Sequence, residues 1–223
     1  MLSSSIAHYN EHGWVLETGA ISASAISEIR SRGLELRNWV SDKVGTPSSY
    51  GTDIHWPGVS CASMYSGSTL LNGYVLDDYL QRFYQSDIMY NNASELLGTG
   101  SIWLFNDQIV VKLPGDNFGF EPHYDNQYGA ENSDGSMHTV NMCVILDDFT
   151  DANGKIAVKH SDDQWVELYP SAGDILALNG NTYHQSNINT SDAPRGLYAC
   201  VYSEAQINLH NFYRERFLTT YSL

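Results

Sequence analysis

From residue 101 onward, short apolar runs alternate with polar turns. The runs are SIWLFND, QIVVKL, FGFEPHYD, HTVNMCVILDDF, KIAVKH, WVELY, DILAL, NTYHQS and GLYACVYS. β-Branched and aromatic residues are frequent in them, and turn residues separate them, as in the segment 151–154, DANG. No helical repeat intervenes, so the pattern predicts a mainly β core, a sandwich or barrel, over about residues 101–203.

The chain before residue 100 reads differently. A short strand is expected within 11–19, a helix from about residue 22 to 40, and one or two helices over 74–97. Asp87 is predicted to cap the last helix, and Gly98 to follow its end. We therefore expect a helical part over about 20–98 that packs on one outer face of the β core.

The stretch 43–73 is rich in Gly, Ser and Pro but also carries aromatic residues. A long loop in a compact domain is usually functional or disordered, so we interpret this one as a wall or lid of a pocket; a surface excursion packed on the core is the alternative. With 223 residues, the chain is predicted to form a single domain, 1–223.

Composition and charge narrow the functional classes. Apolar residues make up 42% of the chain and charged residues 17%, which is typical of a globular protein. The net charge of −15 disfavours nucleic-acid and anionic membrane partners. Three dispersed cysteines without a C-x-x-C motif, and an N-terminus unlike a signal peptide, predict a cytoplasmic protein.

Candidate metal ligands lie in the stretch KLPGDNFGFEPHYD, which ends in His123-Tyr124-Asp125. On an extended strand, residues i and i+2 point to the same face, so His123 and Asp125 can address one point. With the later His184 they form two histidines and one carboxylate, the facial triad of non-heme Fe(II) oxygenases. A second H-x-D pair begins at His160, but it could reach the metal only from an adjacent hairpin.

A candidate anion ligand follows His184. Arg195 opens the run RGLYACVYS, which is expected to pair beside the strand of His184. An inward guanidinium binds a carboxylate with two parallel hydrogen bonds, and a buried arginine without an anion is costly. The sequence therefore predicts an acidic cosubstrate close to the metal.

Four stretches together resemble the phytanoyl-CoA dioxygenase-like branch of the Fe(II)/2-oxoglutarate oxygenases. They are DQIVVKLPG, PHYD, TVNMCVILDDFTDANGKIAV and AGDILALNGNTYHQSNINTSDAPRGLY, within about residues 105–203. The resemblance implies a double-stranded β-helix, the cupin-like jelly roll, packed by the N-terminal helices. It also implies Fe(II) as cofactor, 2-oxoglutarate and O2 as cosubstrates, and hydroxylation of an unactivated C–H bond with release of succinate and CO2.

The resemblance also implies residue roles. His123, Asp125 and His184 would ligate Fe(II), and Arg195 would bind the distal carboxylate of 2-oxoglutarate. Four further residues are expected to contact the cosubstrate or line its pocket: Ser186, Lys112, Asn141 and Thr139. His138 and His160 are given no role.

Two departures leave the substrate open. Where the family often carries Pro-Gly-Ser-His, this chain has AVKHSDDQW, and Tyr124 replaces a frequent Gln. Related halogenases lack the metal carboxylate, so Asp125 favours hydroxylation or desaturation. We expect a small substrate, amino acid-like or zwitterionic, held by the loops 43–73 and 126–136.

Two alternative functions remain open: another cupin-type metal enzyme, and a non-catalytic jelly-roll binding protein. The sequence does not specify the oligomeric state.

Overall fold

The computed structural model describes residues 3–44, 62–64, 77–114, 119–128 and 138–205. Most of the predicted substrate loop 43–73 and most of the loop 126–136 lie outside these ranges; within the first, residues 43–44 end a helix and residues 62–64 form a strand, which a loop prediction did not include. None of the described helices combines the length and the apolar character that a bilayer-crossing helix requires.

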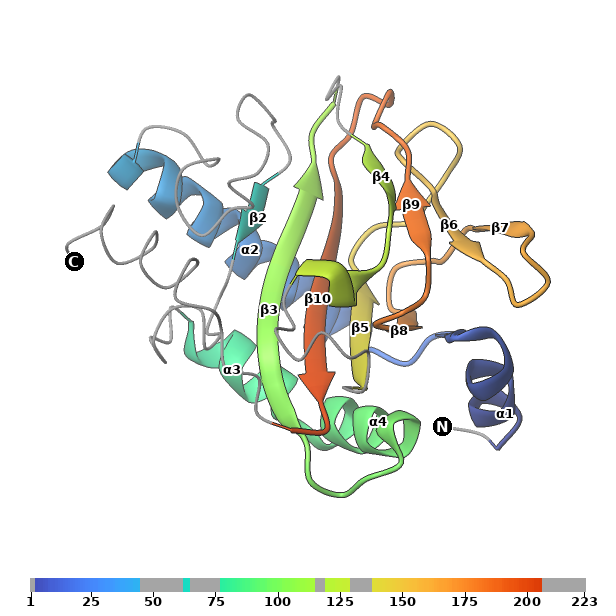
Figure 1. Ribbon diagram of the computed structural model, residues 1–223. Helices are drawn as coiled ribbons and strands as arrows, with labels where there is room; N and C mark the ends of the chain where they lie inside the picture. The colour runs from blue at the N-terminus through green and yellow to red at the C-terminus, as the bar shows by residue number, and fades with distance from the viewer. Residues whose placement is uncertain (1–2, 45–61, 65–76, 115–118, 129–137, 206–223) are drawn as a thin grey trace.

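Two antiparallel sheets form the β core (Figure 1). The major sheet has six strands, in the order β1 (Trp14–Glu17), β8 (Ile175–Asn179), β5 (Thr139–Ile145), β10 (Arg195–Ser203), β3 (Trp103–Lys112) and β2 (Ala62–Met64). The minor sheet has four, in the order β4 (Phe120–His123), β9 (His184–Ser186), β6 (Ile156–Lys159) and β7 (Trp165–Leu168). The prediction of a mainly β jelly roll with flanking helices is confirmed.

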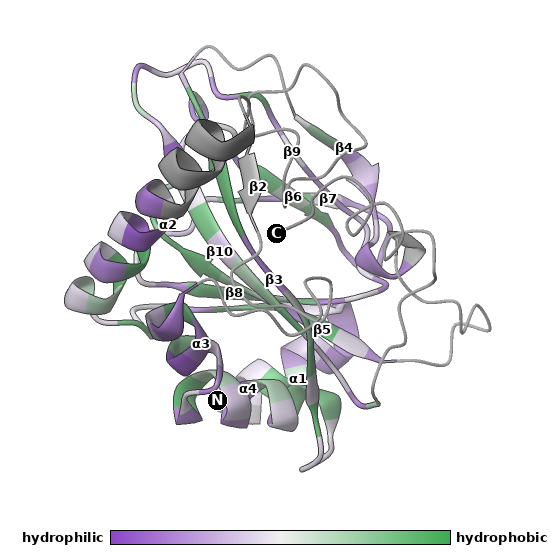
Figure 2. Ribbon diagram, turned by 90° about the vertical axis from the view of Figure 1, so that its left-hand side faces the viewer, coloured by the Kyte–Doolittle hydropathy of each residue, from purple (hydrophilic) through white to green (hydrophobic). Residues whose placement is uncertain are grey.

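Helices α2 (Ala23–Val44), α3 (Asp78–Tyr84) and α4 (Asp87–Leu97) cover the face of the major sheet that points away from the minor sheet (Figure 2). Helix α1 (Ser3–His12) packs against the edge strand β1 and against α4. The fully buried side chains Ile29 of α2, Leu80 of α3 and Met89 of α4 belong to one apolar cluster with strands of the major sheet. Burial of this apolar surface is the main force that fixes these three helices on the sheet.

Strand β5 shows how one sequence serves both faces of the major sheet. Val140, Met142 and Val144 pack in the cluster that contains the helices. The alternate residues point between the two sheets: Cys143 belongs to the second cluster, and Asn141 lines a pocket. Both faces of β5 are covered, so every residue of this strand is buried. Because successive side chains alternate, its polar residues all lie on one face, the one that points toward the minor sheet.

Several predicted elements differ in detail. Helix α1 was not predicted, and the two runs over 101–113 form one strand, β3. Helix α4 begins at Asp87, so its N-cap is Ser86 and the prediction of Asp87 as cap is wrong. Gly98 follows this helix in the left-handed conformation, as predicted, with φ of 68°.

The turn between β5 and β6 brings the backbone close to the pocket. Gly154 has φ of +87°, and a Cβ atom there would lie 2.5 Å from the carbonyl oxygen of Asn187. The same Cβ would lie 3.2 Å from Cδ of Lys112 and 3.3 Å from Nη2 of Arg195. Glycine is therefore required both for the backbone conformation and for the space.

We predict that Gly154→Ala lowers the free energy of unfolding by about 2–4 kcal/mol, because left-handed strain and a backbone clash add up. Gly98→Ala is the matched control. Gly98 is also left-handed, but a Cβ atom added there would meet nothing within 4 Å, so strain alone should cost about 1 kcal/mol. Urea unfolding of both variants measures the difference, and equal losses would contradict the assigned clash.

Candidate metal centre and anion pocket

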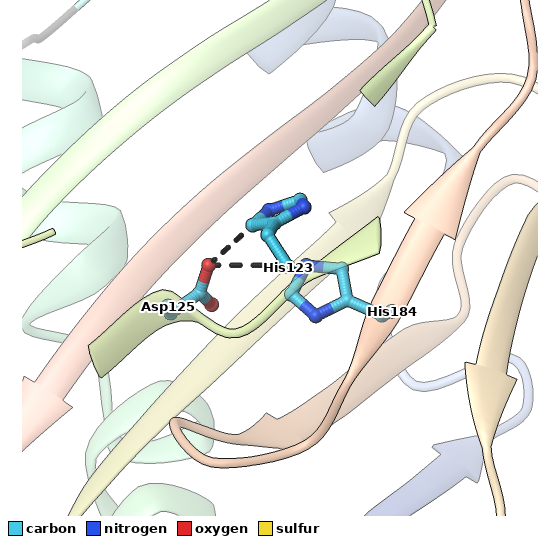
Figure 3. Close-up of side chains that lie close together, drawn as sticks. All are labelled: His123, Asp125 and His184. Carbon is cyan, nitrogen blue, oxygen red and sulfur yellow. Dashed lines mark ion pairs between the residues drawn. The ribbon is translucent and has the colours of Figure 1, made fainter. Parts of the chain in front are cut away.

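Three potential metal ligands converge between the two sheets (Figure 3). His123 ends β4 and faces His184, the first residue of β9, in the antiparallel register. Oδ1 of Asp125 lies 3.8 Å from Nε2 of each histidine. Among the described residues this is the one group of three or more His, Cys, Asp or Glu side chains whose ligand atoms all lie within 4.8 Å of one another.

The way in which Asp125 reaches this point differs from the prediction. It does not continue the strand of His123 but begins a short 3-10 helix, η3 (Asp125–Tyr128). The chain therefore turns directly after β4, and the turn brings the carboxylate back toward the imidazoles (Figure 3).

Both imidazoles are oriented by backbone carbonyl groups. Nδ1 of His123 lies 2.7 Å from the carbonyl oxygen of Glu121, and Nδ1 of His184 lies 2.9 Å from that of Thr182. A neutral ring that donates through Nδ1 carries its lone pair on Nε2, the atom that faces Asp125. Burial, and then the neighbouring His184, lower the pKa of His123, which favours the neutral form that a metal requires.

The carboxylate is held from its other side. Nδ2 of Asn141 on β5 donates a hydrogen bond of 2.8 Å to Oδ2 of Asp125. This leaves Oδ1 to face the two histidines. One carboxylate oxygen and two imidazole nitrogens on one side of a point, with an open pocket opposite, fit a divalent iron site. These three residues would hold the metal.

A pocket extends from this centre between the sheets. Its lining combines the triad with polar and apolar side chains from both sheets: Gln108, Val110, Phe120, Asn141, Cys143, Phe149, Ile156, Leu178, Ser186, Arg195, Leu197 and Ala199. A concave, largely apolar site with a few convergent polar groups is typical of small-molecule binding.

Two buried cations lie where β3 ends and β10 begins, and one of them, Arg195, lines the pocket. Arg195 and Lys112 are directly opposite each other in the register, and both side chains are fully buried. Arg195 donates from Nη2 to the carbonyl oxygen of Gly154 at 2.5 Å, and its guanidinium carbon lies 4.2 Å from the centre of the Phe149 ring. These contacts fix the plane of the guanidinium group, as recognition of a carboxylate requires.

Lys112 and Ser186 are joined to each other. Nζ of Lys112 donates to Oγ of Ser186 at 2.7 Å and also contacts the carbonyl oxygen of Asn187. Ser186 lines the pocket, whereas Lys112 is not among its lining residues. Of the four predicted cosubstrate contacts, Ser186 and Asn141 therefore reach the pocket directly, and Lys112 lies behind Ser186.

Thr139 lies on the same strand face as Asn141 but outside the pocket lining. Its hydroxyl donates to Oδ1 of Asn126 at 2.6 Å, so it connects β5 to the residue after Asp125. His138 lies at the surface, near Glu204. His160 stacks on His12 of α1, with ring centres 3.6 Å apart, away from the triad.

Cys143 and Phe149 are pocket residues for which the sequence predicted no role. Cys143 lies two residues after Asn141, so strand alternation from Asn141 would have identified it. Phe149 follows the end of β5, and no local pattern connects it with Arg195, which is distant in the sequence.

No protein-family model matches the chain. Two curated proteins match part of it. One is a 2-aminoethylphosphonate dioxygenase from uncultured bacterium HF130_AEPn_1, 27% identical over 161 residues, which are 61% of this chain and 60% of that protein. The other is Dioxygenase ALT11 from Alternaria alternata, 24% identical over 159 residues, 60% of this chain and 49% of that protein. The match spans less than two thirds of either relative.

Solved structures match nearly the whole chain. EctD from S. alaskensis, with 2-oxoglutarate and 5-hydroxyectoine, has a TM-score of 0.76 at 16% identity and covers 94% of this chain and 78% of that one. The epimerase SnoN, in complex with Fe3+, alpha ketoglutarate and nogalamycin RO, has a TM-score of 0.73 at 16% identity and covers 94% and 88%. At such identities these structures establish the fold. Both curated relatives are named dioxygenases, and these similarities agree with the predicted resemblance to the phytanoyl-CoA dioxygenase-like Fe(II)/2-oxoglutarate oxygenases.

Proposed function

We propose that this protein is an Fe(II)- and 2-oxoglutarate-dependent dioxygenase that hydroxylates a C–H bond of a small molecule and releases succinate and CO2. The observation that carries the proposal is the convergence of His123, Asp125 and His184 beside a pocket that also contains a buried arginine. Bound iron would supply the oxygen activation, which the protein side chains cannot perform by themselves.

The residues of this chain would bind and orient. In this proposal Arg195 binds the distal carboxylate of 2-oxoglutarate, and Ser186, fixed by Lys112, contributes a hydroxyl beside it. Val110 and Leu197, which are paired in the register and line the pocket, provide an apolar path between this end and the metal. A linear dicarboxylate with a short methylene chain matches this order of cationic, apolar and metal-binding groups.

For the substrate, we propose a small zwitterionic or amino acid-like compound. One relative is named for 2-aminoethylphosphonate, which carries an amine and an anionic group, and the EctD structure contains 5-hydroxyectoine. The low number of Lys and Arg residues, eleven in all, makes a polyanionic substrate less compatible with the chain.

We further propose that residues 1–223 act as one catalytic domain in the cytoplasm. Cys143 and Cys200 are both free and buried, which is compatible with a reducing compartment.

The first test is succinate formation by protein loaded anaerobically with Fe(II) and then given 2-oxoglutarate, O2 and pools of amino acids, osmolytes and aminophosphonates. One pool should stimulate succinate release, and Asp125→Ala should abolish this stimulated release because the metal loses its carboxylate ligand. Asp162→Ala, in the second H-x-D pair, is the matched control and should retain full activity. Metal binding without any dependence on 2-oxoglutarate would instead favour a different cupin-type enzyme.

A second prediction concerns the cationic end. Arg195→Gln should raise the KM for 2-oxoglutarate about 10–100-fold, because a hydrogen-bonded charge pair of roughly 1.5–3 kcal/mol is lost. Arg32→Gln removes an arginine of α2 that pairs with Glu28 and Asp77 and does not line the pocket, so it should leave this KM unchanged. Initial rates of succinate release at varied 2-oxoglutarate give both values. An unchanged KM in folded Arg195→Gln would refute the assigned contact.

A further inference from the structure

Asp125 can use its two carboxylate oxygens in different ways, and one of them is already engaged. Oδ1 faces the Nε2 atoms of His123 and His184, whereas Oδ2 accepts the 2.8 Å hydrogen bond from Asn141. A carboxylate can bind a metal through one or both oxygens. A hydrogen bond to Oδ2 opposes its rotation toward the metal, and so favours binding through Oδ1 alone.

The amide of Asn141 is itself oriented from the other side. Sγ of Cys143 donates to Oδ1 of Asn141 at 3.4 Å. With the amide turned over, its oxygen would face the carboxylate oxygen of Asp125 and its N–H groups would face the thiol. The thiol as donor and the carboxylate as acceptor therefore select the same orientation of the amide.

The three residues form a directed chain from Cys143 to Asn141 to Asp125. Cys143 and Asn141 lie two positions apart on β5, and both line the pocket. Burial raises the pKa of the Cys143 thiol well above its ordinary value, so the group keeps its proton and remains a donor. A thiol is a weak donor, so its part is to orient the amide, while the amide restrains the carboxylate.

We propose that Asn141 and Cys143 are positioning residues which hold Asp125 as a one-oxygen metal ligand and thereby set the metal affinity and the number of open coordination positions. This inference rests on the metal site of the proposed function and deepens it. It assigns Asn141 a role toward Asp125 in addition to the predicted contact with the cosubstrate, and it gives Cys143 a role where the sequence indicated only an apolar strand position.

The test is equilibrium binding of Co(II) alone to the full chain, followed by its visible absorption spectrum, which reports the number and kind of ligands. Asn141→Leu removes the donor, keeps the branched shape and the number of heavy atoms, and should weaken Co(II) binding about 10–100-fold, as loss of a hydrogen-bond partner to a metal ligand typically does. The spectrum should change as well, because Oδ2 becomes available to the metal. Asn141→Ala, which adds no atoms, is the second variant in case the first does not fold.

Cysteine variants separate orientation of the amide from packing. Cys143→Ala should weaken Co(II) binding about threefold, and Cys143→Ser, which keeps a donor, should restore it. Cys200→Ala is the matched control, because Cys200 is equally buried but lies in the cluster on the helix-covered face of the major sheet. It should leave affinity and spectrum unchanged. Thermal unfolding of each metal-free variant establishes that it is folded.

The outcomes distinguish two failures. If the wild-type chain binds no Co(II), the proposed metal site is wrong and the inference fails with it. If the wild type binds Co(II) but both Asn141 variants, shown to be folded, bind it with the same affinity and spectrum, the metal site stands and the positioning role is refuted. Equal losses in Cys143→Ala and Cys200→Ala would assign the cysteine effect to packing.

Discussion

The structure depends on the alternation of side chains along β5 and β10, two central strands of the major sheet. In β5 and β10 one set of residues is fixed by helix packing, including Met142 and Tyr198, which are fully buried. The other set, which includes Asn141 and Arg195, is thereby forced between the two sheets. A shift of one residue in either strand would exchange these sets and remove the polar groups from the pocket. The apolar face therefore fixes the register on which the chemistry relies.

The sequence was sufficient for a mainly β architecture, because strand alternation and turn residues are visible over a few positions. It also indicated the group of three potential ligands, but the choice of the H-x-D pair at His123 over the pair at His160 needed the position of His184 and the family resemblance. The route of Asp125 was not visible, since a strand and a 3-10 turn both bring its carboxylate near His123. The contact of Phe149 with Arg195 was also not visible, because it arises from tertiary packing between distant segments.

Charge is distributed unevenly between surface and interior. The chain carries a net charge of −15, yet Arg195 and Lys112 are fully buried at one end of the pocket. Cations in a site of low dielectric interact with an anion far more strongly than cations on an exposed surface. In the proposed function, this arrangement explains how so acidic a protein can bind an anionic cosubstrate. The cationic end of the pocket is also separate from the acidic Asp125. The amide of Asn141 holds this carboxylate at the other end.

In the proposed function one site holds both a metal and a dicarboxylate, and each strengthens the binding of the other. Calorimetric titration of 2-oxoglutarate into the protein, under anaerobic conditions and with or without Fe(II), measures this coupling. We expect one equivalent bound per chain, with an affinity at least tenfold higher in the presence of Fe(II), because the metal supplies additional ligand bonds. Binding of equal strength with and without the metal, or no binding in either case, would refute a shared site.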